Sequence, residues 1–363
     1  MLTGRLIIRA DASSSIGHGH VMRCLALAQA WQDHGGECTF VIAHVIPGLE
    51  QRLRSEGCEV VRPDVLPGSR EDAIGIAQLA TVKGAAWVVV DGYHFRHEYY
   101  RVLKDAGIRV LQIDDYGTVG AYESSVILDQ NAGAAEYFYS NRERSTDLLL
   151  GTRFILLRRE FTAWPRRKRA TSRMARKILI TMGGSDPENL TLRSIEAVSL
   201  LRNEDLEVVI VVGAGNSYLD SLQAAVGARG NQYRVLTNVS SMPELMAWAD
   251  IAIIAGGGTL WELLYMGCPV VTYARNSKQE EILSYLRTQK TVQFMGLAEE
   301  CDPAGLASAL SDLMSSPARR REMAAQGRAT VDGLGAQRVC EVLINGSKFD
   351  NRVEYGSSLA ARS

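Results

Sequence analysis

A histidine placed directly after a glycine-rich turn is the residue of this chain best suited to acid–base chemistry. The turn, Gly17-His18-Gly19-His20, is expected between a strand over 6–9 and a helix over 20–34. Glycines at a helix N-terminus expose backbone N–H groups, which together with the helix dipole favour a bound anion. The dipole also disfavours a protonated imidazole, so His20 can act as a neutral base, although a lone histidine is also a common structural residue. The pattern predicts a phosphate-bearing substrate beside a histidine.

The same turn departs from a dinucleotide-binding loop. Met22 occupies the position of the third glycine in the G-x-G-x-x-G pattern. The next expected strand ends at Ala43 without the acidic residue that would hold a nicotinamide cofactor's ribose. These departures argue against a redox cofactor, and we expect the protein to use no cofactor.

A second glycine turn, Gly256-Gly257-Gly258, follows an expected strand over 250–255 and precedes an expected helix over 260–266. Bare N–H groups can approach a diphosphate there. Glu262 lies one helical turn later and can accept hydrogen bonds from ribose hydroxyls. Thr259 and Glu262 also have the spacing of a capping box, which needs no ligand but does not require three glycines. We therefore favour nucleotide binding.

A third turn, Gly183-Gly184-Ser185, ends the first expected strand of the second half, over 177–181. Because the carboxyl ends of parallel strands meet at one edge of a sheet, this turn should open beside the triple glycine. It is either a further anion-binding turn or a plain strand-to-helix connection.

Acidic residues follow three expected strands of the first half. They are Asp91, the pair Asp114-Asp115, and Asp129, which is followed by Gln130-Asn131. Each could cap a helix or close a turn. Together they predict a row of hydrogen-bonding groups suited to a hydroxylated or acetamido sugar.

Composition excludes several function classes. A formal net charge of −1 over 363 residues gives no reason to expect nucleic acid or a membrane surface as a partner. The six cysteines are scattered without a C-x-x-C pair, so we expect buried, reduced thiols. The histidine pairs 18/20 and 94/97 lack a third ligand, so no metal site is expected. Without a signal-peptide-like start or a membrane-length apolar run, we expect a cytoplasmic protein. The oligomeric state stays open.

Apolar runs of strand length alternate with amphipathic stretches throughout, which predicts an α/β protein with two doubly wound, Rossmann-like domains facing a cleft. We expect an N-terminal domain over 1–162, a linker over 163–175, a C-terminal domain over 176–348 and a flexible tail over 349–363. The linker contains the basic run Arg166–Arg169, which could bind an anion but which we interpret as solvated. Further strands are expected at 39–43, 59–62, 87–91, 109–113, 126–129, 207–212, 233–236 and 269–272, and further helices at 50–56, 71–83, 98–105, 189–201, 243–249 and 279–288.

Eight segments, taken in order, resemble a known family. They are Arg9–Ser13, Gly17–Cys24, Val89–Tyr93, Ile113–Asp115, Leu128–Asn131, Leu156–Phe161, Met182–Pro187 and Gly256–Glu262. The chain is similar, from about residue 5 to 345, to the UDP-2,4-diacetamido-2,4,6-trideoxy-β-L-altropyranose hydrolases of pseudaminic acid biosynthesis. The combination is far more specific than any single motif.

The resemblance implies the two-domain glycosyltransferase-B architecture and a metal-independent, inverting hydrolysis that releases UDP and the free sugar. It implies that the C-terminal half binds UDP, that His20 is catalytic and that Tyr93 lies in the active site. Substrate contacts are then expected at Asp11, Gly17, Gly19, Arg23, Asp91, Gly183, Gly184, Ser185, Gly257, Gly258, Thr259, Glu262, Lys278 and Gln279.

One departure concerns an Asn-Gln pair that the family usually has after the strand following the glycine turn. This chain has Asn276-Ser277-Lys278-Gln279, so Gln279 can be matched while Lys278 takes the place of the asparagine. The lysine could pair with the diphosphate. The sugar specificity is therefore open, and two alternatives stand beside the hydrolase: a glycosyltransferase of the same fold, and a non-enzymatic nucleotide-sugar-binding protein.

Overall fold

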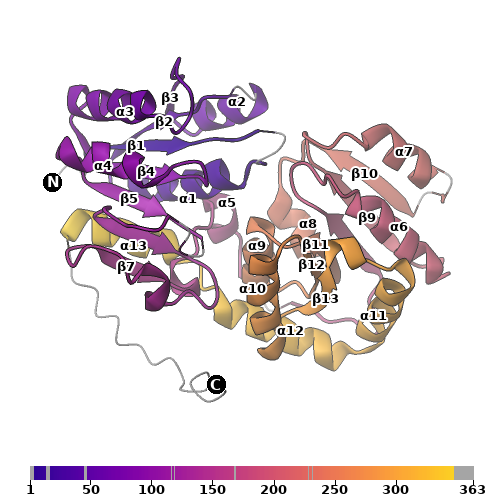
Figure 1. Ribbon diagram of the computed structural model, residues 1–363. Coiled ribbons are helices and arrows are strands. Elements are labelled where there is room, and N and C mark those ends of the chain that lie inside the picture. Colours follow the sequence, from indigo (N-terminus) through magenta and orange to yellow (C-terminus); the bar gives the residue numbers. More distant parts are fainter. Residues whose placement is uncertain are drawn as a thin grey trace.

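The computed structural model describes residues 4–13, 17–44, 47–115, 117, 119–166, 169–227, 229–230 and 232–346. The expected tail over 349–363 lies outside these residues, as do Arg167 and Lys168 of the basic run. The described chain forms two lobes, each built around its own parallel sheet (Figure 1).

The first lobe contains a seven-stranded parallel sheet in the order β3-β2-β1-β4-β5-β6-β7. Its central strands are buried on both faces because helices cover both sides. In β1, Leu6 and Ile8 pack into one core cluster, whereas Ile7 packs into the cluster on the opposite face. The elements are β1 (Arg5–Ala10), α1 (Gly19–Asp33), β2 (Glu37–Val41), α2 (Pro47–Ser55), β3 (Glu59–Val61), α3 (Arg70–Val82), β4 (Ala85–Asp91), α4 (His97–Asp105), β5 (Val110–Ile113), β6 (Val126–Asp129), η1 (Glu136–Tyr139), β7 (Asp147–Leu150), η2 (Thr152–Phe154) and α5 (Arg159–Thr162).

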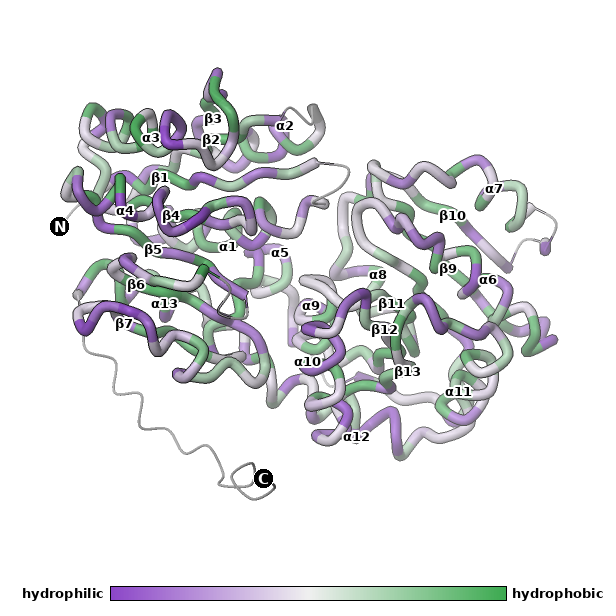
Figure 2. Tube along the Cα trace, in the orientation of Figure 1, coloured by the Kyte–Doolittle hydropathy of each residue, from purple (hydrophilic) through white to green (hydrophobic). Residues whose placement is uncertain are grey.

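The second lobe contains a six-stranded parallel sheet in the order β10-β9-β8-β11-β12-β13. Figure 2 shows hydrophobic strands at β11 and β12 inside this lobe, whereas α3 on the surface of the first lobe alternates hydrophobic and hydrophilic residues. The elements are β8 (Lys177–Thr181), α6 (Leu190–Leu200), β9 (Glu207–Val212), α7 (Leu219–Gly227), β10 (Tyr233–Thr237), α8 (Met242–Trp248), β11 (Ile251–Ala255), α9 (Gly258–Met266), β12 (Val270–Ala274), α10 (Ser277–Thr288), β13 (Gln293–Leu297), η3 (Ala298–Glu300), α11 (Pro303–Ser315), α12 (Pro317–Thr330) and α13 (Gly335–Asn345).

The predicted fold class is confirmed. Every expected strand is present, with its ends within two residues of the expected ones, and both sheets are parallel. The edge strands β7 and β13 were not expected, nor were α7, α11, α12 and α13. All six cysteines are buried and unpaired, as expected. Among the described residues, none of the helices has the length and apolar character needed to cross a bilayer.

The last helix, α13, packs on the first lobe, although it follows the second lobe in sequence (Figure 1). Its apolar face joins the core beneath α1 through Val339, Cys340 and Leu343, among others. The indole N–H of Trp87 in β4 donates to the carbonyl oxygen of Leu343 at 2.8 Å. The expected boundary of the C-terminal domain, 176–348, is therefore wrong for α13, because the core that buries this helix belongs to the first sheet.

The contact of α13 with the first lobe can be tested by truncating one buried side chain. Leu343→Ala removes a side chain that is 2% exposed and should lower the free energy of unfolding by about 2–5 kcal/mol. Ile344→Ala is the matched control, because its neighbouring side chain is 41% exposed and should cost no more than about 0.5 kcal/mol. Denaturant unfolding measures the cost. Hydrogen exchange should quicken in α1 and not in β8 or β11; faster exchange confined to the second lobe would contradict this packing.

Candidate functional site

The polar residues of the first lobe gather where its strands end. In the sheet, Ala10 lies opposite Asp91, Asp91 opposite Ile113, and Ile113 opposite Leu128. The residues that end or follow these four strands therefore form one row along the carboxyl edge. The N-terminus of α1, which carries His20, lies against this row.

His20 is held by a carboxylate. Its Nδ1 lies 2.7 Å from Oδ1 of Asp91, at the end of β4. Since an ionised carboxylate can only accept, this distance assigns the proton to Nδ1 and leaves Nε2 as the nitrogen that can take a proton. His20 is only 7% exposed, so its ring orientation is fixed by packing as well as by Asp91.

Arg23 lies one helical turn after His20 and joins two buried carboxylates. Its guanidinium donates to both oxygens of Asp91 at 2.7 Å and to both oxygens of Asp115 at 2.9 Å. Burial opposes ionisation of Asp91, but the charge of Arg23 and the hydrogen bonds from Arg23 and His20 outweigh it and hold the pKa of Asp91 far below its usual value. Arg23 likewise keeps the pKa of buried Asp115 below normal. Both carboxylates are thus ionised in the absence of bulk water.

The row continues through Asn131 and Asp129. The side-chain amide of Asn131 donates to Asp115 at 2.8 Å and to Asp129 at 2.9 Å, and the hydroxyl of Tyr139 donates to Asp129 at 2.9 Å. Burial, followed by the charge of Asp115, raises the pKa of Asp129 from 3.8 to about 6. These acidic side chains are buried, and hydrogen bonds from Arg23 and Asn131 join them. They position residues rather than line an open sugar site, which corrects the expectation drawn from the sequence.

Tyr93 is the exposed member of the cluster. The residue is 56% exposed, its hydroxyl donates to Asp115 at 3.0 Å, and its ring meets His20 edge-on with centroids 4.9 Å apart. A substrate could therefore touch Tyr93 directly while its hydroxyl stays linked to the buried network.

Three residues expected to contact substrate serve inside the first lobe. Asp91 is fully buried and orients His20 and Arg23, while Arg23 itself is held between two carboxylates. Asp11 is 2% exposed; it pairs with Arg9 at 2.7 Å and with His94 at 3.0 Å, and it accepts the N–H of Ala43. A carboxylate enclosed by such partners has no surface left for a sugar. The expectation of direct substrate contacts at Asp11 and Asp91 is therefore corrected, whereas the contact at Arg23, whose side chain is 14% exposed, stays a prediction.

The two lobes meet at Gly184. A methyl group at this glycine would lie 3.4 Å from Nδ1 of His18 and 3.9 Å from Cα of Gly17, so Gly184 lies directly against the turn before His20. Gly183 stands at φ +84°, a left-handed backbone that favours glycine. Because Ile254 pairs with Thr181, the turn at 183–185 lies beside the turn at 256–258. The structure thus brings Gly17, Gly19 and His20 to the same side of the second sheet as both of its glycine turns.

The triple-glycine turn starts α9 without a side-chain cap. Gly257, at φ +149°, is the N-cap residue, and Thr259 lies inside the helix. The capping-box interpretation of Thr259 and Glu262 is therefore wrong, because the helix begins two residues earlier than the sequence suggested. No side chain caps the start of α9. Backbone N–H groups there are therefore available to bind an anion.

Glu262 is tied to the first lobe. Arg158, just before α5, donates to its carboxylate at 2.7 Å. Burial raises the pKa of Glu262, while the charge of Arg158 opposes this rise. Arg158 lies in the segment Leu156–Phe161, which carries part of the family resemblance, but the sequence predicted no role for it. The available signal was a charged residue directly after the buried apolar run Ile155–Leu157.

The segment that departs from the family pattern starts α10. The side chain of Asn276 accepts the N–H of Gln279 at 2.9 Å and thereby caps the helix. Oε1 of Gln279 accepts the N–H of Arg275 at 2.9 Å and lies against Gly256, so Gln279 supports the glycine turn. The ammonium of Lys278 lies 5.9 Å from the ring centre of Phe138 in η1 of the first lobe. Lys278 is thus placed where the two lobes approach each other.

Within the described ranges, no group of three or more His, Cys, Asp or Glu side chains is arranged to hold a metal ion. His94 contacts Asp11, and His97 lies 3.6 Å from Glu123, so this pair serves two separate contacts.

The raised pKa of Asp129 predicts a pH-dependent stability. A carboxyl whose pKa is about 6 when folded and 3.8 when unfolded binds more protons in the folded state between these values, so stability falls as pH rises from about 4 to 6. Asp129→Asn keeps the bonds that Oδ1 accepts from Asn131, while the Tyr139 hydroxyl must turn to accept from the new amide; the change should recover up to about 3 kcal/mol above pH 6. Denaturant unfolding at pH 4.5 and 7.5 would measure this difference.

The matched control is Asp147→Asn, at an exposed aspartate that begins β7. Burial also raises the pKa of Asp114, so the Asp129→Asn profile should flatten without becoming level. Identical pH profiles for Asp129→Asn and the parent protein would contradict the proposed cost of ionising Asp129.

Comparison with known proteins identifies the second lobe. Residues 178–338 match the family described as the Glycosyltransferase family 28 C-terminal domain. An uncharacterised protein of Methanocaldococcus jannaschii is 23% identical over 76% of this chain and 57% of its own length. The spore coat polysaccharide biosynthesis protein SpsG of Bacillus subtilis is 28% identical over 55% of this chain and 58% of its own length. The chain thus spans less than two thirds of the length of both relatives.

The UDP-2,4-diacetamido-2,4,6-trideoxy-β-L-altropyranose hydrolase of Campylobacter jejuni is 24% identical over 78% of this chain and 96% of its own length. Among solved structures, MurG of Acinetobacter baumannii is 17% identical and superposes with a TM-score of 0.63, covering 95% of this chain and 100% of that one. The UDP-GlcNAc 2-epimerase of Neisseria meningitidis is 12% identical, with a TM-score of 0.62 over 94% of this chain and 100% of that one. The chain therefore has the glycosyltransferase-B fold, and residues 178–338 of its second lobe are similar to the Glycosyltransferase family 28 C-terminal domain.

Proposed function

We propose that this protein is an enzyme that cleaves a UDP-linked sugar, with water as the acceptor. The observation that carries the proposal is the 2.7 Å bond between Nδ1 of His20 and Asp91, made beside a loop that contacts the second lobe at Gly184. A carboxylate that fixes one ring nitrogen leaves the other as a base of defined direction. The second lobe, whose family relatives include UDP-sugar enzymes, supplies the nucleotide site.

In the proposed reaction, Nε2 of His20 takes a proton from a water molecule as the water oxygen attacks the anomeric carbon. The bond between that carbon and the diphosphate oxygen breaks, and UDP leaves with the bonding electrons. The uncapped N–H groups at the start of α9 stabilise the charge that develops on the diphosphate. Attack opposite the leaving group inverts the anomeric configuration. As UDP is a good leaving group, the proposal needs neither a metal ion nor a second carboxylate as nucleophile.

We propose a diacetamido-trideoxy sugar as the substrate, in pseudaminic acid biosynthesis, because the Campylobacter relative of that name aligns over 96% of its length. Lys278 stands where that family usually has asparagine, beside Phe138 of the opposite lobe. We therefore expect Lys278 to influence which UDP-sugar is accepted. The protein would act in the cytoplasm, where nucleotide sugars are made.

The alternative is transfer of the sugar to an acceptor alcohol. It is favoured by relatives named UDP-N-acetylglucosamine–N-acetylmuramyl-(pentapeptide) pyrophosphoryl-undecaprenol N-acetylglucosamine transferase, 25% identical over 47% of this chain. Measuring UDP release from several UDP-sugars, with and without acceptors, separates the two activities. Release that requires an acceptor identifies a transferase, whereas tight binding without release under any condition identifies a binding protein.

Replacement of His20 tests the proposed base. His20→Ala should lower turnover at least about a hundredfold, the contribution typical of a positioned base, while UDP affinity stays within a factor of two. Turnover is measured as UDP release and affinity by calorimetry. His34→Ala, at an exposed histidine beyond the other end of α1, is the matched control. Near-normal turnover of folded His20→Ala would remove His20 from the mechanism.

Replacement of Glu262 tests the proposed ribose contact. Glu262→Gln should weaken UDP binding about tenfold, as expected for a lost hydrogen bond to a charged group, but should weaken 2′-deoxy-UDP binding much less. Exposed Glu299→Gln serves as the control. Equal losses for both nucleotides would show that Glu262 acts only through its ion pair with Arg158.

A further inference from the structure

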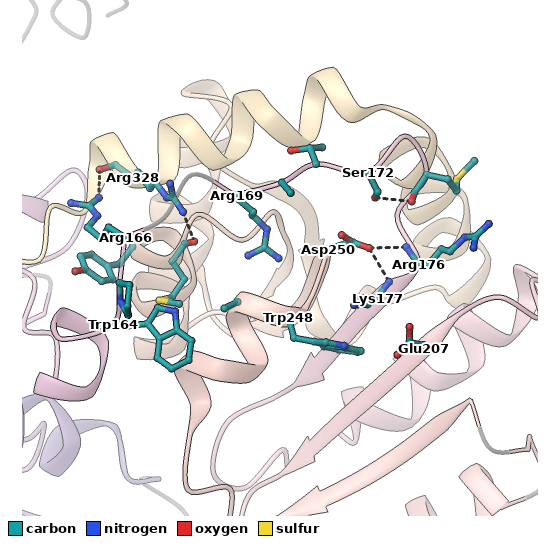
Figure 3. Close-up of a pocket in the computed structure, with 17 residues that line it drawn as sticks. Trp164, Arg166, Arg169, Ser172, Arg176, Lys177, Glu207, Trp248, Asp250 and Arg328 are labelled. Carbon is teal, nitrogen blue, oxygen red and sulfur yellow. Dashed lines mark hydrogen bonds between the residues drawn. The ribbon is translucent and has the colours of Figure 1, made fainter.

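A cavity of about 980 Å³ lies on the second lobe, away from the proposed catalytic residues (Figure 3). Its walls come from the segment that links the two lobes, the end of α8, the end of α9 and the helix α12. Arg166 and Arg169 of the basic run line this cavity; Arg166 is exposed, as expected for a solvated linker, and Arg169 is half-buried.

Three guanidinium groups concentrate positive charge in the cavity. Arg166 donates to the carbonyl oxygens of Asp332 and Arg328, Arg169 to that of Met246, and Arg328 to that of Met266. These carbonyl oxygens carry no net charge. Within the described part of the chain, no ion pair is found for Arg166 or Arg169. Hydrogen bonds therefore orient Arg166 and Arg169 without neutralising them.

The mutual effect of these charges is visible at Arg328. Burial and then the charges of Arg166 and Arg169 lower its pKa. Gly267, in a left-handed conformation at the end of α9, leaves the space that the guanidinium of Arg328 occupies. The chain thus holds three like charges close together in a partly buried hollow, an arrangement that a multiply charged anion would stabilise.

Aromatic side chains accompany the charges. The guanidinium of Arg166 stacks on Tyr265, 4.7 Å from its ring centre. Figure 3 shows Arg169 extending into the middle of the cavity, with Trp164 and Trp248 along the same side. At the opposite end, Asp250 accepts the backbone N–H groups of Arg176 and Lys177 and is thus occupied by the chain itself. The basic end therefore faces a hollow with flat apolar surfaces.

We propose that this cavity is a second ligand site, which binds a small molecule carrying a phosphate group on a ring. The phosphate lies between Arg166, Arg169 and Arg328, and the ring packs against Trp164 or Trp248. Arginine forks match phosphate oxygens, and indole surfaces suit sugar or aromatic rings. The proposal is independent of the proposed function, because no residue of this cavity belongs to the network of His20 or to the glycine turns.

Calorimetric titration with phenyl phosphate and with inorganic phosphate, at low salt, tests the site. Phenyl phosphate should bind more tightly than inorganic phosphate, and the double variant R166Q/R169Q should weaken its binding at least about tenfold. One of the two variants Trp164→Leu and Trp248→Leu should remove the preference for the ring-bearing probe. Arg321→Gln, at an exposed arginine on α12, removes one positive charge outside the cavity, as Arg169→Gln does inside it, and should bind as the parent does.

Melting curves show whether each variant is folded. If R166Q/R169Q is unfolded, Arg169→Gln alone replaces it in the titrations, because this change removes only one hydrogen bond to a carbonyl oxygen. Glu262→Gln, in the proposed nucleotide site, should leave phenyl phosphate binding unchanged, which separates the two sites. Equal affinities in R166Q/R169Q and Arg321→Gln would overturn the proposal. So would arginine-dependent binding to anionic lipid vesicles without binding of phenyl phosphate, which would identify a membrane contact instead.

Discussion

The buried bridge from Arg23 to Asp91 and Asp115 is the interaction on which the first lobe's site depends. Two carboxylates and a histidine are held together away from water, and only one strong positive charge compensates them. Removing one partner of such a network typically costs about 3–5 kcal/mol, because it leaves an uncompensated buried charge. The orientation of His20 therefore follows from Arg23 as much as from Asp91. His20 and Arg23 lie one turn apart at the start of α1. The position of this helix end therefore places both the proposed base and the arginine that holds its carboxylate partner.

The second lobe is joined to this network by few but specific contacts. Gly184 admits His18 at close range, and Arg158 reaches from the first lobe to Glu262 near the start of α9. Apolar side chains next to Arg158, including Leu157 and Phe161, pack in the core cluster that also holds Leu264 of α9. The position of the triple-glycine turn relative to His20 is thus set by contacts at the side of α9 as well as by the linking segment.

The architecture could be predicted from the sequence because strands buried on both faces are continuous apolar runs, as in Ile251–Ala255. The position of His20, Asp91 and Asp129 at one edge also followed from strand ends alone. Pairings across long separations could not be predicted: the spacing of Arg158 and Glu262 is 104 residues, and no local pattern encodes it. Asp11 shows the opposite failure, since the family resemblance implied a substrate contact there, whereas Arg9 and His94 enclose it. Periodicity shows which face of α13 is apolar but not which core receives it.

The return of α13 to the first lobe has a consequence for how the protein is made. Val339, Cys340 and Leu343 complete a core whose members outside α13 lie between Leu6 of β1 and Leu156, and are therefore synthesised long before this helix. The amino-terminal lobe therefore cannot close its interior while the ribosome is still translating the second lobe. Nascent chains would expose the groove under α1 until the final helix emerges, and premature termination in that helix would damage the lobe that was translated first.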